Sequence, residues 1–177
     1  FLSTSLGCQQ TPLNISGFIT ELHPDTLGYA WLMLVNNGED WFVYQSSNSG
    51  QSWNPVRQFT ADYATLSTTE MGWAILKQTD IGWTLEQSNA AGGIPTTTSI
   101  VLSGKLNLLD ATAGKALIRQ QVLSTGTLHG AQAEIKHSLH VWDESSGLTL
   151  LSERTDGGYW TTGVVDHNHG IYTLDSY

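Results

Sequence analysis

Short apolar runs separated by polar turns follow one another along the chain. Two of them, residues 28–35 and 41–46, flank the turn Asn36-Asn37-Gly38. Asn-Gly between two apolar runs is the strongest short signal for a β-hairpin. The run 41–46 begins with apolar residues at both odd and even positions, and successive side chains of a strand point to opposite faces. We therefore expect this strand to be buried on both faces, between stacked sheets.

The other apolar runs predict further strands. They cover residues 11–20, 56–59, 63–66, 72–77, 83–87, 96–102, 105–109, 114–122, 139–142, 148–151, 159–165 and 170–174. The run 114–122 is rich in residues that favour helix, but its place in the repeat described next predicts a strand. The segment His23-Pro24-Asp25 is expected to be a turn, because proline fixes its own φ angle.

A glycine followed by a bulky residue opens an apolar run at four places, Gly28, Gly72, Gly114 and Gly158. Their spacings are 44, 42 and 44 residues (28 to 72, 72 to 114 and 114 to 158). One four-stranded blade of a β-propeller takes about 40 to 45 residues. The repeat therefore predicts an all-β, β-propeller-like fold with about four blade equivalents of 42–44 residues. A β-sandwich is the alternative, because strands and turns alone do not fix a topology.

The domain organisation expected from these patterns is simple. Residues 11–177 are interpreted as one propeller-like domain or as part of a larger propeller. Residues 1–10 contain the segment FLSTSLGC, which is similar to the end of a signal peptide with a lipoprotein-type Gly-Cys. On that interpretation Cys8 carries a lipid anchor; otherwise the segment is an ordered strand and Cys8 a small buried residue. Cys8 is the single cysteine, which excludes an intrachain disulfide.

The polar turn after residue 46 has a distinctive spacing. Ser46, Asn48, Gly50 and Trp53 form the pattern S-x-N-x-G-x-x-W. Gly50 can take the positive φ of a tight turn, and we expect Trp53 to fold back over that turn. The pattern resembles the Asp-box, the S-x-D-x-G-x-T-W hairpin of sialidases and other BNR-type β-propellers. Asn48 stands where that family has aspartate, and Ser52 where it often has threonine. The resemblance implies a structural hairpin at the outside of a blade.

Composition and charge narrow the class of partner. Charged residues make up 13% of the chain, and the net charge of −9 comes with seven Lys plus Arg. We therefore do not expect the protein to have a surface that binds nucleic acid. No apolar run approaches the length of about 20 residues that a membrane span needs. Abundant Ser, Thr, Asn, Gln and Gly are typical of an all-β extracytoplasmic protein, either secreted, periplasmic or at the cell surface.

The resemblance also implies what a sialidase would need, and the chain departs from it. The family's activity rests on three arginines that hold a carboxylate, a Tyr-Glu nucleophile pair and an aspartic acid/base. The three arginines here are Arg57, Arg119 and Arg154. The segment Gly93-Ile94-Pro95 lacks the arginine of the family's Arg-Ile-Pro, and the resemblance places Arg57 at the outer rim of a propeller. No catalytic residue is therefore assigned.

Carboxylates for a glycosidase pair cannot be chosen from the sequence. Asp80, Glu86, Glu134 and Glu144 lie in or near expected turns, and their separation in space is not written in the sequence. The seven Trp and six Tyr could stack on glycans, although aromatic residues at regular strand positions are more typical of a β-core.

One segment has the composition of a metal site. His167 and His169 would share a face of a strand, with Asp166 beside them, and could bind one ion. The competing interpretation is an exposed hairpin loop with no cofactor. His137 and His140 are three positions apart, on opposite faces of a strand, and are interpreted as surface residues.

These patterns favour a non-enzymatic, extracytoplasmic interaction scaffold that binds a protein or a glycan through a β-propeller. A sialidase-like glycoside hydrolase seen in part is the first alternative, and a β-sandwich adhesin domain at the cell surface is the second. The sequence identifies no binding residue and leaves the oligomeric state open.

Overall fold

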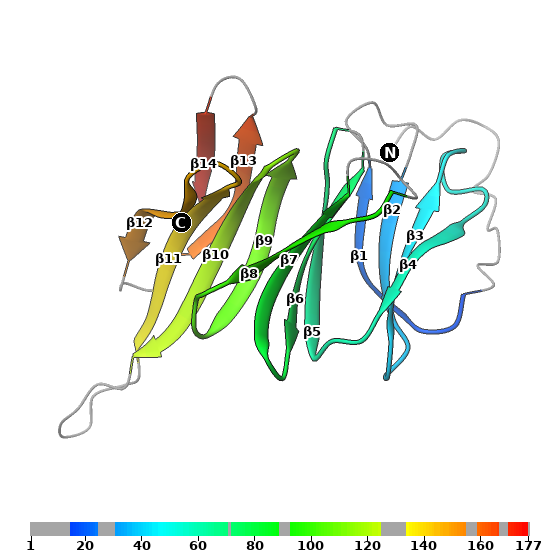
Figure 1. Ribbon diagram of the computed structural model, residues 1–177, viewed down its shortest axis with the longest axis horizontal. Helices are drawn as coiled ribbons and strands as arrows, with labels where there is room; N and C mark the ends of the chain where they lie inside the picture. The colour runs from blue at the N-terminus through cyan, green and yellow to red at the C-terminus, as the bar shows by residue number, and fades with distance from the viewer. Residues whose placement is uncertain are drawn as a thin grey trace.

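The computed structural model describes residues 15–24, 31–70, 72–88, 93–124, 134–154, 159–166 and 170–176. Every regular element within these ranges is a β-strand, so the prediction of an all-β fold is confirmed (Figure 1). The chain forms three antiparallel sheets of four strands each, followed by a two-stranded hairpin.

Within each sheet the strands pair in the order in which the chain forms them. The first sheet consists of β1 (Phe18–Pro24), β2 (Trp31–Asn36), β3 (Trp41–Ser46) and β4 (Asn54–Phe59). The second consists of β5 (Tyr63–Thr68), β6 (Trp73–Thr79), β7 (Gly82–Ser88) and β8 (Thr96–Ile100). The third consists of β9 (Lys105–Thr112), β10 (Lys115–Ser124), β11 (Glu134–Asp143) and β12 (Gly147–Arg154). The hairpin pairs β13 (Tyr159–Asp166) with β14 (Gly170–Ser176).

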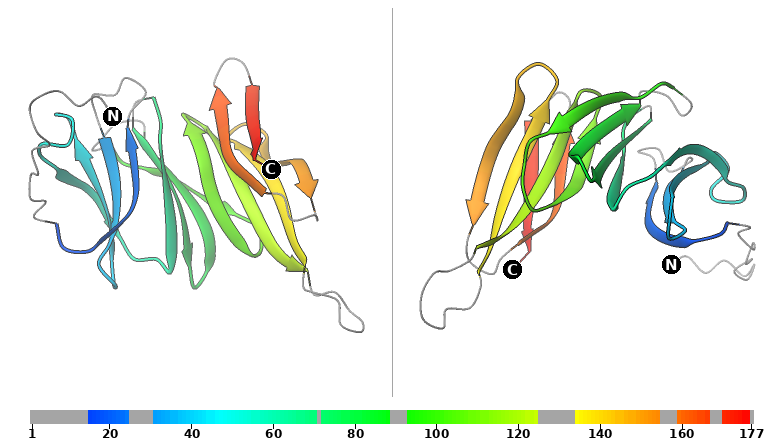
Figure 2. Two further views of the ribbon diagram at one scale, coloured as in Figure 1. Left: turned by 180° about the vertical axis from the view of Figure 1, so that it is seen from behind. Right: turned by 60° about the horizontal axis from the view of Figure 1, so that its bottom comes forward.

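The sheets follow one another as layers (Figure 2). The first strands lie side by side, because β1 contacts β5, β5 contacts β9, and β9 contacts β13. A meander whose first strand lies beside the first strand of the next meander is the arrangement of propeller blades. The described strands form a row, with the first sheet at one end and the third sheet, together with β13–β14, at the other (Figure 1), and no closed ring is seen among them. The two-sheet sandwich does not describe this arrangement.

An apolar layer fills the space between consecutive sheets. Strand β6 contributes to two such layers, since Trp73 and Ile75 pack in the layer toward the first sheet, and Ala74 and Leu76 in the layer toward the third. This is the pattern of a strand buried on both faces. The expectation that β3 is buried on both faces was correct for one face only, since Trp41 and Val43 are buried but Phe42 and Tyr44 only in part. Strand β3 belongs to the first sheet, which has a described sheet on one side only.

Predicted boundaries were wrong at several elements, among them the strand expected over 11–20, which begins at Phe18. Residues His23 and Pro24, expected in a turn, end β1, and proline at the end of a strand adjoining a turn is compatible with pairing. Strand β11 begins at Glu134, five residues before the predicted residue 139. Its early part was missed because it contains polar and charged residues that pair through the backbone with β10.

The fourth glycine of the repeat, Gly158, does not occupy the same position relative to its sheet as Gly72 and Gly114 do. Gly72 and Gly114 precede β6 and β10, the second strands of their sheets. Tyr159, the residue after Gly158, instead opens β13, whose neighbour β9 is a first strand. The first strands begin at residues 18, 63, 105 and 159, so their spacings are 45, 42 and 54 residues. The last spacing is longer because β10 and β11 have 10 residues each.

Candidate functional site

The turn between β3 and β4 is closed by hydrogen bonds among its own residues. The Ser46 hydroxyl accepts hydrogen bonds from the backbone N–H of Asn48 (3.3 Å) and of Gly50 (2.8 Å), and donates one to Asn48 Oδ1 (2.9 Å). Asn48 Oδ1 also accepts from the Ser52 N–H, and Asn48 Nδ2 donates to the Ser52 hydroxyl, both at 2.9 Å. Gly50 takes a φ of 83°, as expected. These side chains are engaged in shaping the turn.

Trp53 closes the same turn. Its indole Nε1 donates to the Gly50 carbonyl at 3.1 Å, and its ring lies 3.7 Å from where a Cβ on Gly50 would stand. The expectation that Trp53 folds back over the turn is confirmed. The corresponding turn of the third sheet joins β11 to β12, where Asp143 Oδ1 accepts from the N–H and the hydroxyl of Ser145. These bonds, and then Lys115, hold the pKa of Asp143 below its usual range.

The metal candidates lie at and beyond the end of a described strand. Asp166 is the last residue of β13, and His167 and His169 lie outside the described residues. Elsewhere in the described ranges, no group of three or more His, Cys, Asp or Glu side chains is placed to hold a metal ion.

His137 and His140 are buried, so the interpretation of them as surface residues was wrong. The His140 Nε2 lies 2.9 Å from Gln120 Oε1, and Gln120 Nε2 donates to the Ser103 carbonyl at 2.7 Å. Burial lowers the pKa of both imidazoles below the usual 6.5, with a further contribution from Arg119 at His137, while Glu153 opposes the shift at His140. The pair belongs to the interior of the third sheet.

Glu86 is the candidate carboxylate that is buried and paired with basic side chains. It is 3% exposed and lies on β7, where Lys77 of β6 forms an ion pair with Oε1. Arg57 reaches it from β4 of the first sheet, with Nη2 at 3.1 Å and Nε at 3.2 Å from Oε2. Two cations therefore compensate one buried carboxylate and tie two sheets together. Both carboxylate oxygens of Glu86 are bound by Lys77 or Arg57, which is typical of an ion-pair cluster that stabilises a fold.

The other carboxylates lie apart in the fold. Asp80 is in the β6–β7 turn and Glu144 is in the β11–β12 turn, on different sheets. Glu134 is the first residue of β11, and its side chain is outside the described part. The structure thus places Asp80, Glu86 and Glu144 in separate surroundings, not together at one site.

Polar side chains join the first strands of neighbouring sheets. Glu21 Oε2 on β1 accepts from the backbone N–H of Leu66 on β5 at 2.8 Å. The Thr65 hydroxyl on β5 accepts from the backbone N–H of Leu108 on β9 at 2.9 Å. These bonds satisfy backbone groups that no strand partner takes, and so they hold the sheets in register at the strands where they meet.

Tyr63 continues this row of contacts. Its hydroxyl donates to Asn107 Oδ1 on β9 at 2.8 Å, and its ring meets Trp83 edge-on at 6.1 Å. Burial, and then the charge of Glu21, raise the pKa of Tyr63 above its usual value, while Arg119 opposes the shift. A tyrosine with a raised pKa stays protonated and acts as a hydrogen-bond donor, which suits positioning and not nucleophilic attack.

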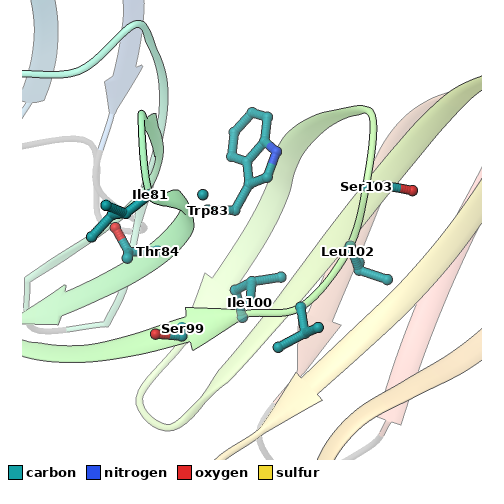
Figure 3. A pocket seen from close by; sticks show the side chains of 9 residues that line it. Ile81, Trp83, Thr84, Ser99, Ile100, Leu102 and Ser103 are labelled. Carbon is teal, nitrogen blue, oxygen red and sulfur yellow. The ribbon is translucent and has the colours of Figure 1, made fainter.

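An open groove of about 430 Å³ lies between the β6–β7 turn and the segment that follows β8 (Figure 3). Its rim carries Ile81 and Val101, which are 87% and 90% exposed. Its floor includes Trp83, which is buried and donates its indole N–H to the Gly104 carbonyl at 3.1 Å. The lining residues are Ile81, Gly82, Trp83, Thr84, Ser99, Ile100, Val101, Leu102 and Ser103. None of them is charged, so the groove offers apolar surface with hydroxyl groups at its margin.

The sequence contains one sign of this groove outside the pattern of apolar runs. Asp80 and Ile81 form the two-residue connection between β6 and β7. A large apolar side chain in so tight a turn cannot be buried by its own hairpin. The sequence indicated the turn but not that Val101, twenty residues later, lies beside the same groove.

A second groove, of about 550 Å³, is acidic. It is lined by Asn36, Gly38, Glu39, Thr60, Ala61, Asp62, Thr79 and Asp80, from turns of the first and second sheets. Its carboxylates are solvent-exposed, so they contribute negative surface charge without forming an enclosed site.

In the part of the chain that the structure describes, no helix has the length and apolar character needed to cross a membrane. No protein-family model matches the sequence, and no curated protein matches it. The functional assignment therefore depends on the geometry alone.

Proposed function

We propose that the protein is a non-enzymatic, extracytoplasmic interaction scaffold of β-propeller type that binds a protein partner in the groove beside β8. The observation that carries the proposal is the exposure of Ile81 and Val101 on the rim of that groove. Apolar side chains gathered around a hollow and rimmed by polar residues are typical of protein-interaction sites.

A protein partner fits this groove better than a glycan does. Glycan sites usually present an exposed aromatic face, whereas Trp41, Trp73, Trp83 and Trp142 are buried among the sheets. Trp83 contributes to the floor but is 5% exposed, so little of its ring is free for stacking. Branched aliphatic side chains on the rim favour an apolar side chain from a partner.

The fold supports the scaffold part of the proposal. Three meanders with adjacent first strands are the arrangement of consecutive blades, and blades present their turns as extended surfaces. The low content of charged residues and the net charge of −9 are consistent with an extracytoplasmic location.

The rival function, glycoside hydrolysis, lacks a favouring observation. A glycosidase needs two carboxyl groups about 5 to 10 Å apart that both face the substrate. Glu86 is buried and engaged by two cations, and Arg57, one of those cations, is thereby occupied with a protein carboxylate. Neither group is placed to receive a sugar.

Peptides selected by display against the intact protein test the proposal. Their affinity is then measured by calorimetry for the wild type, for Ile81→Asp and Val101→Asp, and for Ile94→Asp as the matched control. Ile94 is 97% exposed and does not line the groove. We expect each rim variant to weaken binding by about tenfold or more, and the control to leave it unchanged.

Two results would contradict the proposal. Selected peptides that bind all variants equally would place the interaction elsewhere on the protein. Saturable turnover of fluorogenic sialosides, or of other substrates in a glycoside panel, would support the enzymatic alternative.

A further inference from the structure

The two grooves occupy equivalent places along the stack of sheets. Each lies between the turn that joins the second and third strands of a sheet and the connection to the next sheet. The acidic groove, of about 550 Å³, uses the β2–β3 turn and the β4–β5 connection. The apolar groove, of about 430 Å³, uses the β6–β7 turn and the segment after β8. Both turns lie at the same end of the stack, at the bottom of Figure 1, so the grooves are successive hollows along one face.

Two tryptophans build this equivalence. The indole Nε1 of Trp41 on β3 donates to the Ala61 carbonyl at 2.8 Å, and that of Trp83 on β7 donates to the Gly104 carbonyl at 3.1 Å. Both donors are on the third strand of their sheet, and both acceptors are in the connection to the next sheet. These bonds hold each connection against the sheet before it, so the walls of both grooves are fixed by the fold.

The β6–β7 turn is shared by the two grooves. Asp80 lines the acidic groove, and Ile81, the next residue, lines the apolar one. Stacked sheets lie about 10 Å apart, and an extended chain advances about 3.3 Å per residue. Two side chains about three positions apart in one extended segment therefore have the spacing of the two grooves.

The acidic groove carries charge that the fold leaves uncompensated. Glu39, Asp62 and Asp80 are exposed there, and no Lys or Arg is among the described residues that line either groove. Within the described part of the chain, none of the three carboxylates forms an ion pair. Basic side chains of a partner would gain opposite charges here, while acidic side chains would be repelled by the groove and by the net charge of −9.

We infer that the partner presents an extended segment in which a Val, Ile or Leu stands about three positions from a Lys or Arg. The aliphatic side chain enters the apolar groove beside Ile81 and Val101, and the basic one lies over the acidic groove near Asp62 and Asp80. The inference rests on the proposed function, because it names the partner segment for the same site. The apolar contact supplies affinity, and the charge contact selects among apolar partners.

The composition of selected peptides tests the inference. Random peptides of about ten residues, which span about 33 Å when extended, are displayed and selected against the intact protein at about 0.15 M salt. The same library is selected against the groove variant, which is Asp62→Asn with Asp80→Asn. We expect the wild-type pool to be enriched in an aliphatic residue with Lys or Arg about two to four positions away. The pool from the groove variant should keep the aliphatic residue and lose the enrichment in Lys and Arg.

The most enriched wild-type peptide is then the probe for calorimetry. The groove variant should bind it about fivefold more weakly, since each exposed ion pair contributes little. The matched control is Glu70→Gln with Glu144→Gln, which makes the same change in net charge at exposed carboxylates outside both grooves and should bind as the wild type does. Raising the salt from about 0.1 to about 1 M shortens the screening length from about 10 to about 3 Å, so it should weaken binding to the wild type more than to the groove variant.

Val101→Ser separates this inference from the proposed function, because it removes an apolar rim contact without changing charge. We expect it to weaken binding of the same peptide at least about threefold. If it does so while the groove variant binds as its control does, the proposed function stands and the inference is overturned. A wild-type pool without enrichment in Lys and Arg, or an equal salt dependence, overturns it too. If Val101→Ser has no effect, or no peptide is selected, both fail. Circular dichroism confirms that each variant is folded.

Discussion

Asn48 pairs both of its polar side-chain atoms within the β3–β4 turn. Its carbonyl oxygen accepts from the Ser52 N–H, while its amide nitrogen donates to the Ser52 hydroxyl. An ionised carboxylate can accept but cannot donate. The asparagine at the position where the resembled hairpin carries aspartate therefore pairs both of its polar atoms within the turn. The turn depends on hydrogen bonding and on Gly50, without a need for charge.

Two buried imidazoles make stability depend on pH. The pKa values of His137 and His140 are lowered in the folded protein by burial, so the unfolded chain binds more protons just below the usual value of 6.5. Their contribution is complete above that value and is lost as pH falls toward the lowered pKa values. We expect the free energy of unfolding, from urea titrations, to fall between about pH 7.5 and about pH 5.

The control for this pH dependence is the double variant His137→Gln with His140→Gln. It removes both titrating groups while keeping side chains that can form hydrogen bonds. Its stability should vary less over the same pH range than that of the wild type. An unchanged slope would assign the pH dependence to other groups.

At the scale of elements, the contacts between sheets combine apolar packing with a few directed polar bonds. The ion group of Glu86 joins β4 of the first sheet to β6 and β7 of the second. Lys77 also lies over the ring of Phe59 in β4, with Nζ 5.2 Å from the ring centroid. Strand β4, at the edge of the first sheet, thus forms both an ion pair and a cation–π contact with the second sheet.

Replacing Glu86 with Gln tests how much this ion group contributes. The variant leaves Lys77 and Arg57 facing each other without a compensating charge. We expect a loss of about 2 kcal/mol in the free energy of unfolding, less than for a fully buried pair because the Arg57 side chain is 34% exposed. Urea unfolding of Glu86→Gln is compared with that of Glu39→Gln, an exposed control. A variant as stable as the control would show that the ion group adds nothing net.

At the scale of the whole molecule, each apolar layer is shared by only two consecutive sheets. The layer between the first and second sheets includes Leu34, Trp73 and Ile75, and a separate layer connects the second sheet with the third. The structure is therefore close to a one-dimensional stack, in which stability is transmitted from neighbour to neighbour. The second sheet is the one described sheet with an apolar layer to a sheet on both sides.

A cavity in the first layer should have a local effect. Leu34 is fully buried, and Leu34→Ala should lower stability by about 2 to 5 kcal/mol. We expect hydrogen exchange, followed by mass spectrometry, to accelerate most in β1–β4, less in β5–β8 and least in β9–β12. Equal acceleration in all three sheets would indicate that the molecule opens as one cooperative unit.

The sequence predicted most strands and turns because their signals are local. Alternation of side chains, the pair Asn37-Gly38 and the serine-rich turn before Trp53 act over a few residues, and the structure has these hairpins as expected. The register of the repeat was correct at Gly72 and Gly114 for the same reason, while Gly28 lies outside the described residues. It was wrong at Tyr159, because longer strands in the third sheet moved the next first strand along the chain.

Only the tertiary structure decided which polar and apolar residues are buried. Arg57 and Glu86 are 29 positions apart, and they meet because two sheets stack face to face. His137 was predicted to be exposed and is buried, while the leucines of β12 are exposed. The strand pattern is determined by each segment's own sequence, whereas burial is determined by the sheets that lie on either side. For that reason the sequence determined the all-β architecture, and the tertiary structure decided where its surfaces remain open.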